Sequence, residues 1–187
     1  MEFLVREVKD KEQKAEISRE VLNDLPEWFG MPESTEEYIT DSQDKPLLAS
    51  FHQDQVAGFL VLNATSPDCA DIFVMGVKKK FHRSGVATQL NDDYEKLAKS
   101  SGYSYSQVKT VQSGHYDEYD VTNKFYKSVG YKELEVFPTL WDEWNPCHVP
   151  QPNNLWVRTV SRWQRAHVPP RRQAAGESRR QHGVRRC

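Results

Sequence analysis

A run of small residues lies between an apolar segment and an amphipathic one, and its residue types suit the binding of an anion. It reads Phe81-His82-Arg83-Ser84-Gly85-Val86-Ala87-Thr88, where Gly85 and Ala87 leave room for a ligand to approach the backbone. The N–H groups of such a turn, together with the unsatisfied N–H groups and positive dipole of the helix that follows, can bind a pyrophosphate. An ordinary tight connection between a strand and a helix would use the same residue types, so the run alone leaves both interpretations open.

Two familiar nucleotide-binding motifs do not occur in this run. The GxGxxG spacing of dinucleotide-binding proteins is missing, as is the acidic residue expected about 20 positions further on. The Gly-Lys-Ser/Thr sequence of a P-loop is missing as well. A dinucleotide-binding unit and a P-loop are therefore both excluded as explanations of the small residues.

A strand before the run and a helix after it must hold the run in place. Asp71–Val77 is almost continuously apolar, as expected of a central strand covered on both faces. Apolar residues then recur every three or four positions from Val86 to Ala98 and predict an amphipathic helix. Further strands are expected at Phe3–Val8, Leu47–Phe51, Val56–Asn63, Tyr105–Val111 and Tyr131–Phe137, and further helices at Lys11–Leu25, Pro32–Asp41 and Val121–Val129. This order predicts a mixed α/β sheet with helices on its faces.

Two segments in matching order resemble the GNAT N-acetyltransferase family. Ile72 to Leu90, with His82-Arg83-Ser84-Gly85-Val86-Ala87 in place of Gln/Arg-x-x-Gly-x-Gly/Ala, is similar to the acetyl-CoA-binding motif of that family. Lys124-Phe125-Tyr126-Lys127-Ser128-Val129-Gly130-Tyr131 is similar to its Phe-Tyr-x-x-x-Gly-Phe segment. The resemblance implies a GNAT-like α/β fold, with a mixed, mostly antiparallel sheet flanked by helices on both faces.

The resemblance also implies an activity and a coenzyme site. The expected protein is an acyltransferase that moves an acetyl group from acetyl-CoA, its co-substrate, directly to a primary amine of a small molecule or peptide, with no metal. Backbone groups of Met75 and Val77 would lie beside the acetyl group and the pantetheine arm. The residues expected to bind the pyrophosphate are His82, Arg83, Ser84, Gly85, Val86, Ala87 and Thr88.

Direct transfer needs an acid for the leaving thiolate and a base for the attacking ammonium group. The resemblance matches Tyr126 to a tyrosine whose hydroxyl protonates the thiolate; an aromatic residue packed beside Phe125 is the alternative. Asp71 is the candidate base, because the family often places a carboxylate on this strand. Glu27, His115 and a relay through water compete with it, and an ordinary surface carboxylate is the plainer interpretation.

Trp28 and Phe29 are expected to line the acceptor pocket. Large aromatic side chains supply shape and cation–π contact for an amine, although packing in the core explains the two residues as well. The acidic and aromatic stretch from His115 to Asp120 would suit a cationic amine, or would be a solvated loop. The spacings do not identify the acceptor.

The end of the chain departs from the family pattern. The resemblance covers Phe3 to Cys147 and points to one bacterial branch, which predicts a GNAT acetyltransferase domain at residues 1–147. Where the family continues with a last apolar strand, His148-Val149-Pro150-Gln151-Pro152 intervenes. An atypical segment is therefore expected at 148–165, where Leu155–Val160 could pair as the missing strand. Residues 166–187 are expected to be an Arg-rich disordered tail.

The charge of the tail differs from that of the rest of the chain. Arg158 to Cys187 contains nine arginines, no lysine and one acidic residue, a formal charge of +8, whereas the preceding residues carry −10. The interpretations are an extension translated from a shifted frame or by read-through, or an arm that binds nucleic acid. Because the body is acidic, a nucleic-acid partner is not expected.

Composition limits the remaining classes. A length of 187 residues fits one domain with its own core, and no stretch approaches the roughly 20 apolar residues of a membrane span. The N-terminus lacks the pattern of a signal peptide, so a cytoplasmic protein is expected. Cys69, Cys147 and Cys187 have no CxxC spacing and are expected to be free thiols. The alternatives to an enzyme are a coenzyme-binding sensor or partner-binding module without turnover, and a nucleic-acid-associated acetyltransferase; a homodimer is left open.

Overall fold

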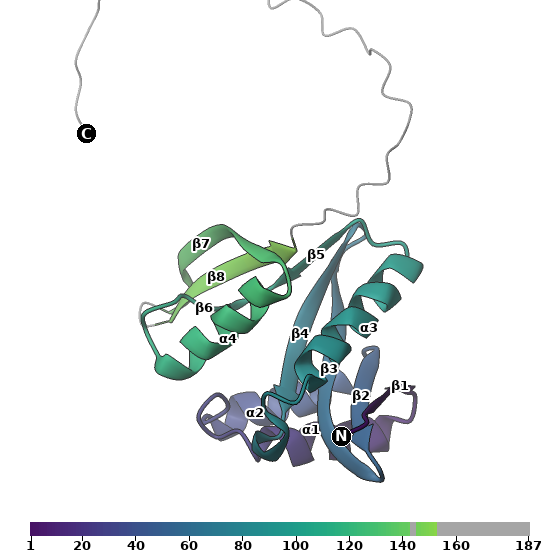
Figure 1. Cartoon of the computed structure of the whole chain (residues 1–187). Helices are drawn as coiled ribbons and strands as arrows, with labels where there is room; N and C mark the ends of the chain where they lie inside the picture. Colours follow the sequence, from purple (N-terminus) through teal and green to yellow (C-terminus); the bar gives the residue numbers. More distant parts are fainter. Residues whose placement is uncertain (143–144, 153–187) are drawn as a thin grey trace, which may run out of the picture.

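A computed structural model of the chain describes residues 1–142 and 145–152, whose path is drawn in Figure 1. The elements in chain order are β1 (Leu4–Val8), α1 (Lys11–Leu22), α2 (Pro32–Ser42), β2 (Leu47–His52), β3 (Gln55–Ser66), β4 (Cys69–Val77), the short 3-10 helix η1 (Lys79–Phe81), α3 (Val86–Ser100), β5 (Tyr105–Val108), β6 (Thr110–Val111), α4 (Asp117–Ser128), β7 (Tyr131–Asp142) and β8 (Asn145–Pro152). No helix in this part of the chain is both long and apolar enough to cross a membrane.

Five strands form the main sheet in the order β1-β2-β3-β4-β5. All neighbours are antiparallel except β4 and β5, which run parallel. The mixed, mostly antiparallel sheet predicted from the sequence is therefore confirmed.

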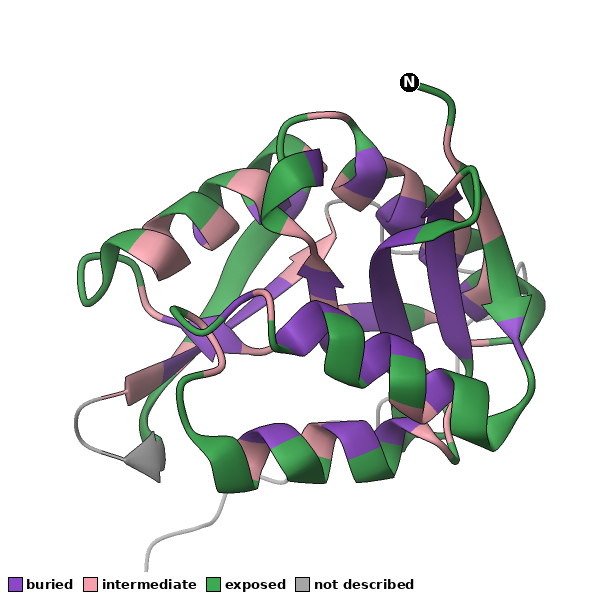
Figure 2. Ribbon diagram, turned by 90° about the horizontal axis from the view of Figure 1, so that it is seen from below, coloured by how far each residue is buried: buried purple, intermediate pink, exposed green. Residues whose placement is uncertain are grey.

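The central strand β3 divides the interior into two cores, because its side chains alternate between the faces of the sheet. Phe59 and Val61 belong to a core that also contains Ile17 and Val21 of α1 and Ile39 of α2. Leu60 and Leu62 belong to the opposite core, with Val86, Leu90 and Tyr94 of α3. Both faces of the sheet are thus covered by helices, as predicted, and Figure 2 shows the buried sides of the helices turned towards the strands.

A second, smaller sheet has the order β6-β8-β7. Its central strand, β8, lies earlier in the sequence than Leu155–Val160, the segment expected to supply the last strand. β8 runs from Asn145 to Pro152 and so crosses the expected domain boundary after residue 147. Gln112 donates its backbone N–H to the carbonyl of Pro146 (3.0 Å), which places the backbone groups of Pro146 on the β6 side. Backbone groups point to alternate sides of a strand, so those of Pro150 and Pro152 point to the same side as those of Pro146, away from β7. β6 pairs only with Cys147 and His148, so neither proline nitrogen faces a residue of β6 or β7 that needs a donor. The prolines therefore do not interrupt the pairing with β7, and the alternative strand Leu155–Val160 lies outside the described residues.

The strands β4 and β5 are paired only at one end and separate at the other, and this separation creates the space for the candidate site. The parallel pairing covers only Cys69–Ile72 of β4 and Tyr105–Val108 of β5. At the next residue, Phe73, the register between β3 and β4 shifts, since Leu62 pairs with Ile72 but Val61 pairs with Val74. Such a bulge increases the local twist of a strand. The rest of β4 therefore continues without β5 beside it and leaves an open edge.

Candidate active site

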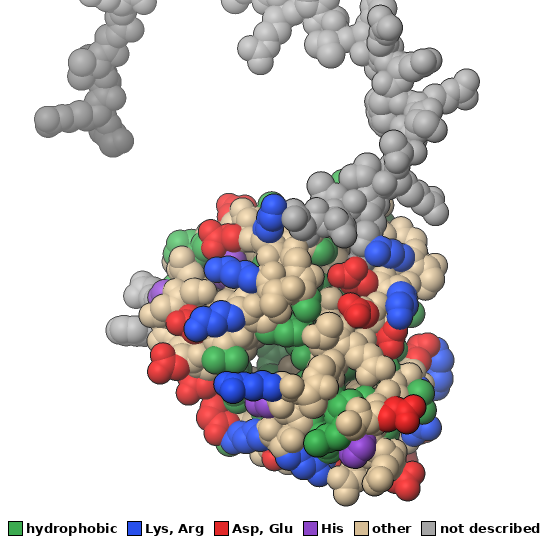
Figure 3. Space-filling view, viewed as in Figure 1, with side chains coloured by type: hydrophobic (Ala, Val, Ile, Leu, Met, Phe, Trp, Pro, Cys, Tyr) green, Lys and Arg blue, Asp and Glu red, His purple; other side chains and the backbone are tan. Residues whose placement is uncertain are grey.

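A cavity of about 670 Å³ fills the opening between β4 and the segment formed by β5 and β6. Residues of β4, the loop before α3, α4 and the connection between α1 and α2 line it. Figure 3 shows the corresponding hollow between α4 and α3, with hydrophobic side chains at its base. Within the described residues, no group of His, Cys, Asp and Glu side chains could hold a metal ion.

The loop before α3 forms one end of the cavity and presents free backbone donors. Gly85, the N-cap of α3, has φ of +91°, and a Cβ atom built on it would meet nothing within 4 Å. The backbone nitrogens of Arg83, Gly85, Val86, Ala87 and Thr88 have no hydrogen-bond acceptor among the described residues, since the first bond of α3 runs from Gln89 N to Gly85 O. These five residues line the cavity. The arrangement fits the pyrophosphate of a coenzyme, which needs donors and an open approach.

Ser84 and His82 occupy different positions in this loop. Ser84 is not among the lining residues, and its hydroxyl donates to the carbonyl of Phe81 at 2.5 Å. His82 lines the cavity and donates from Nε2 to the carbonyl of Val77 at 2.7 Å. The ring of His82 also meets Trp28 edge to face, with centroids 6.1 Å apart. The predicted coenzyme residue His82 thus joins the loop to the end of β4, while Ser84 holds the turn together.

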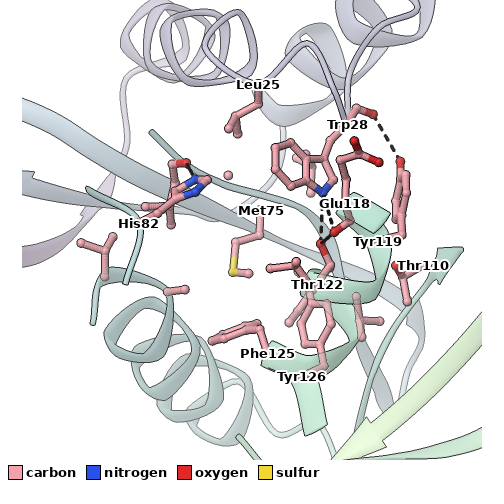
Figure 4. Close-up of a pocket in the computed structure, with 18 of the residues that line it drawn as sticks. Leu25, Trp28, Met75, His82, Thr110, Glu118, Tyr119, Thr122, Phe125 and Tyr126 are labelled. Carbon is pink, nitrogen blue, oxygen red and sulfur yellow. Dashed lines mark hydrogen bonds between the residues drawn. The ribbon is translucent and has the colours of Figure 1, made fainter. Parts of the chain in front are cut away.

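Met75 and Val77 lie on the open edge of β4, where both line the cavity and are half-buried. In Figure 4, Met75 lies between His82 on one side of the cavity and Thr110 and Tyr119 on the other. The two residues that the sequence placed beside the pantetheine arm therefore both line the cavity on the strand that leads to the loop before α3.

Tyr126 brings a phenol to the same cavity from α4. Its side chain is 4% exposed, and its ring packs against Phe125 and Tyr131 with centroids 5.3 and 5.4 Å away. Burial raises the pKa of Tyr126 well above its usual range, and the nearby Tyr131 and Asp71 raise it further. The hydroxyl has no hydrogen-bond partner in the described part of the chain, and Tyr126 is among the residues that line the cavity.

Asp71 lies behind the cavity wall rather than in it. Its side chain is 6% exposed, and its Oδ2 accepts a hydrogen bond from Lys109 Nζ at 2.8 Å. Burial raises the pKa of Asp71, although Lys109 opposes the change. Lys109 lines the cavity whereas Asp71 does not. The structure therefore separates the candidate base from the open space by a lysine, and the competitors Glu27 and His115 also lie outside the lining.

Trp28 ties the connection between α1 and α2 to α4. Its Nε1 donates to the carbonyl of Glu118 (3.2 Å) and to Thr122 Oγ1 (3.1 Å). In return, the hydroxyl of Tyr119 donates to the carbonyl of Trp28 at 3.2 Å. Figure 4 shows these contacts at the edge of the cavity, which Trp28 and the adjacent Phe29 both line. Both predicted acceptor residues thus lie at the cavity, and Trp28 has a further role in holding α4.

The sequence did not predict a polar contact that joins α4 to the smaller sheet through Asn123, Val111 and His148. Asn123 Nδ2 donates to the carbonyl of Val111 (2.9 Å), which turns Asn123 Oδ1 towards His148 Nδ1 at 3.1 Å. His148 Nε2 lies 3.2 Å from a carboxylate oxygen of Glu133 but forms no hydrogen bond. Asn123 precedes Tyr126 by one helical turn, so this contact fixes the position of the phenol. The sequence signal was an asparagine on the expected buried face of a helix.

Comparisons with known proteins identify the family and the fold of the chain. The model of the acetyltransferase (GNAT) domain matches residues 9–137, whereas no curated protein sequence matches the chain. A GNAT-family protein from Desulfovibrio desulfuricans has the same fold, with a TM-score of 0.68 at 15% identity over 80% of this chain and 98% of that chain. A GNAT family acetyltransferase from Elizabethkingia anophelis, with acetyl-CoA bound, gives 0.59 at 16% identity over 80% and 94%.

A third solved structure has a named substrate. The aminoglycoside 6'-N-acetyltransferase from Enterococcus faecium gives a TM-score of 0.61 at 17% identity, over 80% of this chain and 96% of that chain. These likenesses agree on one fold, and the domain model covers more than two thirds of the sequence. The chain therefore belongs to the GNAT acetyltransferase family.

Proposed function

We propose that this protein transfers the acetyl group of acetyl-CoA directly to the primary amine of a small molecule or peptide. The observation that carries the proposal is that free backbone donors and a free phenol share one cavity. The free donors of Arg83, Gly85, Val86, Ala87 and Thr88 belong to the loop and the start of α3, and Tyr126 lines the same cavity from α4. Acetyl-CoA supplies the acetyl thioester when it is bound.

The residues of the chain have separate tasks in this reaction. The loop before α3 holds the pyrophosphate, and the open edge of β4 orients the arm that follows it. Transfer forms a C–N bond and breaks a C–S bond, so the amine must lose a proton and the thiolate must gain one. Tyr126 donates its proton to the thiolate, because it lines the cavity and a tyrosine phenol is protonated at neutral pH.

The proton of the amine leaves towards water at the acceptor end. Asp71 is shielded by Lys109, so the proposal gives it the role of holding Lys109 and not that of direct base. Asp117 and Glu118 line the cavity near this end and favour the approach of a cation.

Release of the coenzyme thiol tests the proposal. Purified protein with acetyl-CoA should release the thiol when amines are added, and mass spectrometry should find the matching N-acetyl product. Binding of acetyl-CoA without release in the presence of any amine would contradict the enzyme and support the alternative, a coenzyme-binding module.

A further inference from the structure

One end of the cavity has a continuous aromatic surface. We call it the aromatic wall, and it consists of Trp28, Phe29, Tyr38, Phe73 and Tyr119, all of which line the cavity and are half-buried. The rings of Phe29 and Tyr38 meet edge to face at 5.9 Å, and those of Tyr38 and Phe73 at 5.4 Å. Tyr119 joins the wall through its hydrogen bond to the carbonyl of Trp28.

Apart from Trp28, whose ring also meets His82, the aromatic wall lies away from the part of the cavity that fits the coenzyme phosphates. In Figure 4, Tyr119 and Thr110 lie on the side opposite His82, with Met75 between. Phe73 is the bulged residue at which β4 leaves β5, so the wall begins where the sheet parts. A ligand that follows β4 from the loop reaches the wall only beyond Met75. The wall therefore belongs to the acceptor end.

The charges near the wall suit an acceptor that carries an ammonium group. Lys109 lines the cavity and is paired with the buried Asp71, so this pair adds no net charge. Lys45 Nζ lies 4.5 Å from the ring centroid of Phe73 and 3.6 Å from a carboxylate oxygen of Asp41, so this pair adds no net charge either. Among the lining residues, the remaining carboxylates are Asp117 and Glu118 in the first turn of α4.

Hydroxyl-rich ligands also fit this end poorly. The Tyr119 hydroxyl already donates a hydrogen bond to the carbonyl of Trp28, and Trp28 Nε1 already donates to Glu118 and Thr122 of α4. Thr110 Oγ1, which has no partner among the described residues, and the carboxylates of Asp117 and Glu118 can pair with a few polar groups. A ligand that packs many hydroxyls against the aromatic rings would leave others without partners, which costs affinity. The cavity of about 670 Å³ must also hold the pantetheine arm, so the acceptor is small.

We infer that the acceptor is a small primary monoamine carried on an aromatic or flat apolar body, an arylalkylamine in chemical class. The ring packs on the aromatic wall, and the amine points back along β4 towards Met75. The inference rests on the proposed function, because it names the substrate of the same site. It also sets the protein apart from acetyltransferases that act on aminoglycosides.

Amine binding to the protein saturated with coenzyme A tests the inference without relying on turnover. The probes are 2-phenylethylamine, n-butylamine as an amine without the ring, spermidine and kanamycin, each titrated by calorimetry. Burying a phenyl ring should make 2-phenylethylamine bind roughly 10- to 100-fold more tightly than n-butylamine. Spermidine or kanamycin binding more tightly than 2-phenylethylamine would overturn the inference.

Two variants locate the binding to the wall. Phe73→Leu and Tyr38→Leu should each reduce the preference for 2-phenylethylamine over n-butylamine by several-fold and keep the response to the coenzyme. Phe51→Leu is the matched control, because Phe51 is buried in the same core without lining the cavity. An unchanged preference in both wall variants, with melting curves that confirm folding, would overturn the inference.

Thiol release measured in parallel separates the two claims. Preferred binding of 2-phenylethylamine without release of thiol would contradict the proposed function and leave the aromatic site standing. Release with all primary amines at equal kcat/KM would support the function and overturn the inference.

Discussion

Tyr126 and Asp71 were both expected to take part in proton transfer, but their surroundings give them different tasks. Both are 4% exposed, and burial raises the pKa of both side chains. Tyr126 lines the cavity, whereas Asp71 lies where β4 is still paired with β5 and Lys109 covers it. The phenol is therefore the group with access to the cavity, while one oxygen of the carboxylate is paired with Lys109.

Removing the phenol hydroxyl should affect catalysis and not coenzyme binding. We expect Tyr126→Phe to lower kcat by roughly 10²-fold, the low end of the effect of general acid catalysis, because the thiolate loses its proton donor. Steady-state kinetics and the shift of melting temperature with acetyl-CoA measure the two properties. An equal loss of coenzyme binding would mean that Tyr126 has only a packing role.

At the scale of elements, the sequence predicted the main sheet and α3 well because their apolar periodicity is strong. It placed the start of α4 at Val121, whereas the helix begins at Asp117. Asp117, Glu118 and Asp120 favour a first turn through the positive end of the helix, but they give no apolar periodicity. The prolines concealed β8, and the contact between Asn123 and His148 depends on where β8 lies. The parting of β4 from β5 also has no local sequence signal, so the acceptor end could not be built from the sequence.

The loop before α3 predicts a specific loss of coenzyme binding. Saturating acetyl-CoA should raise the melting temperature, because a ligand that binds only the folded state stabilises it. Gly85→Val should abolish this shift, since a β-branched residue is strained at φ of +91° and its side chain would occupy the open approach.

A matched change controls for the stability of the variant. Gly102→Val places the same side chain at φ of +92° beyond the end of α3, away from the cavity. It should cost stability but keep the acetyl-CoA shift. A normal shift in Gly85→Val would contradict the role of the loop.

The buried contact between His148 and Asn123 predicts that the stability of the fold decreases at acidic pH. Burial lowers the pKa of His148, although Glu133 opposes the change. As the pH falls below about 6.5, the unfolded chain takes up a proton that the folded chain resists. The free energy of unfolding should therefore decrease between pH 7 and pH 5, by at most about 1.4 kcal/mol per pH unit for this one group.

Urea unfolding at pH 7 and pH 5 measures this dependence. His148→Gln should lose less stability than the natural sequence over that range, because the variant has no proton to take up at this position. His115→Gln, which changes an exposed histidine, should retain the full dependence. Equal pH dependence in all three proteins would exclude His148 as the cause.

At the scale of the whole molecule, the described fold and the cavity need no residue beyond Pro152. Among the described residues, those that line the cavity lie between Leu25 and Tyr126, and β8 ends at Pro152. The Arg-rich part of the sequence follows these elements and has the opposite charge to the body. We propose that it was not selected together with the acetyltransferase domain.

Shortening the chain tests this proposal. A protein ending at Arg165 should keep its melting temperature and its response to acetyl-CoA. A protein ending at Asn154 also loses the β-branched and aromatic run Leu155–Val160, and we expect it to be less soluble or less stable. Loss of activity on purified small amines when only residues 166–187 are removed would instead make the tail part of the site.

The free N–H groups before α3 have a consequence for how such a protein can evolve. Every residue except proline carries the same main-chain donor, so in the proposed coenzyme site most side chains from Arg83 to Thr88 can be exchanged without removing a donor to the pyrophosphate. Selection then acts on the shape of the turn, above all on Gly85, and hardly on the chemistry of its neighbours. A lineage built on this loop can drift far in sequence and change its acceptor end while the coenzyme end stays intact, which fits a shared fold at about 15% identity.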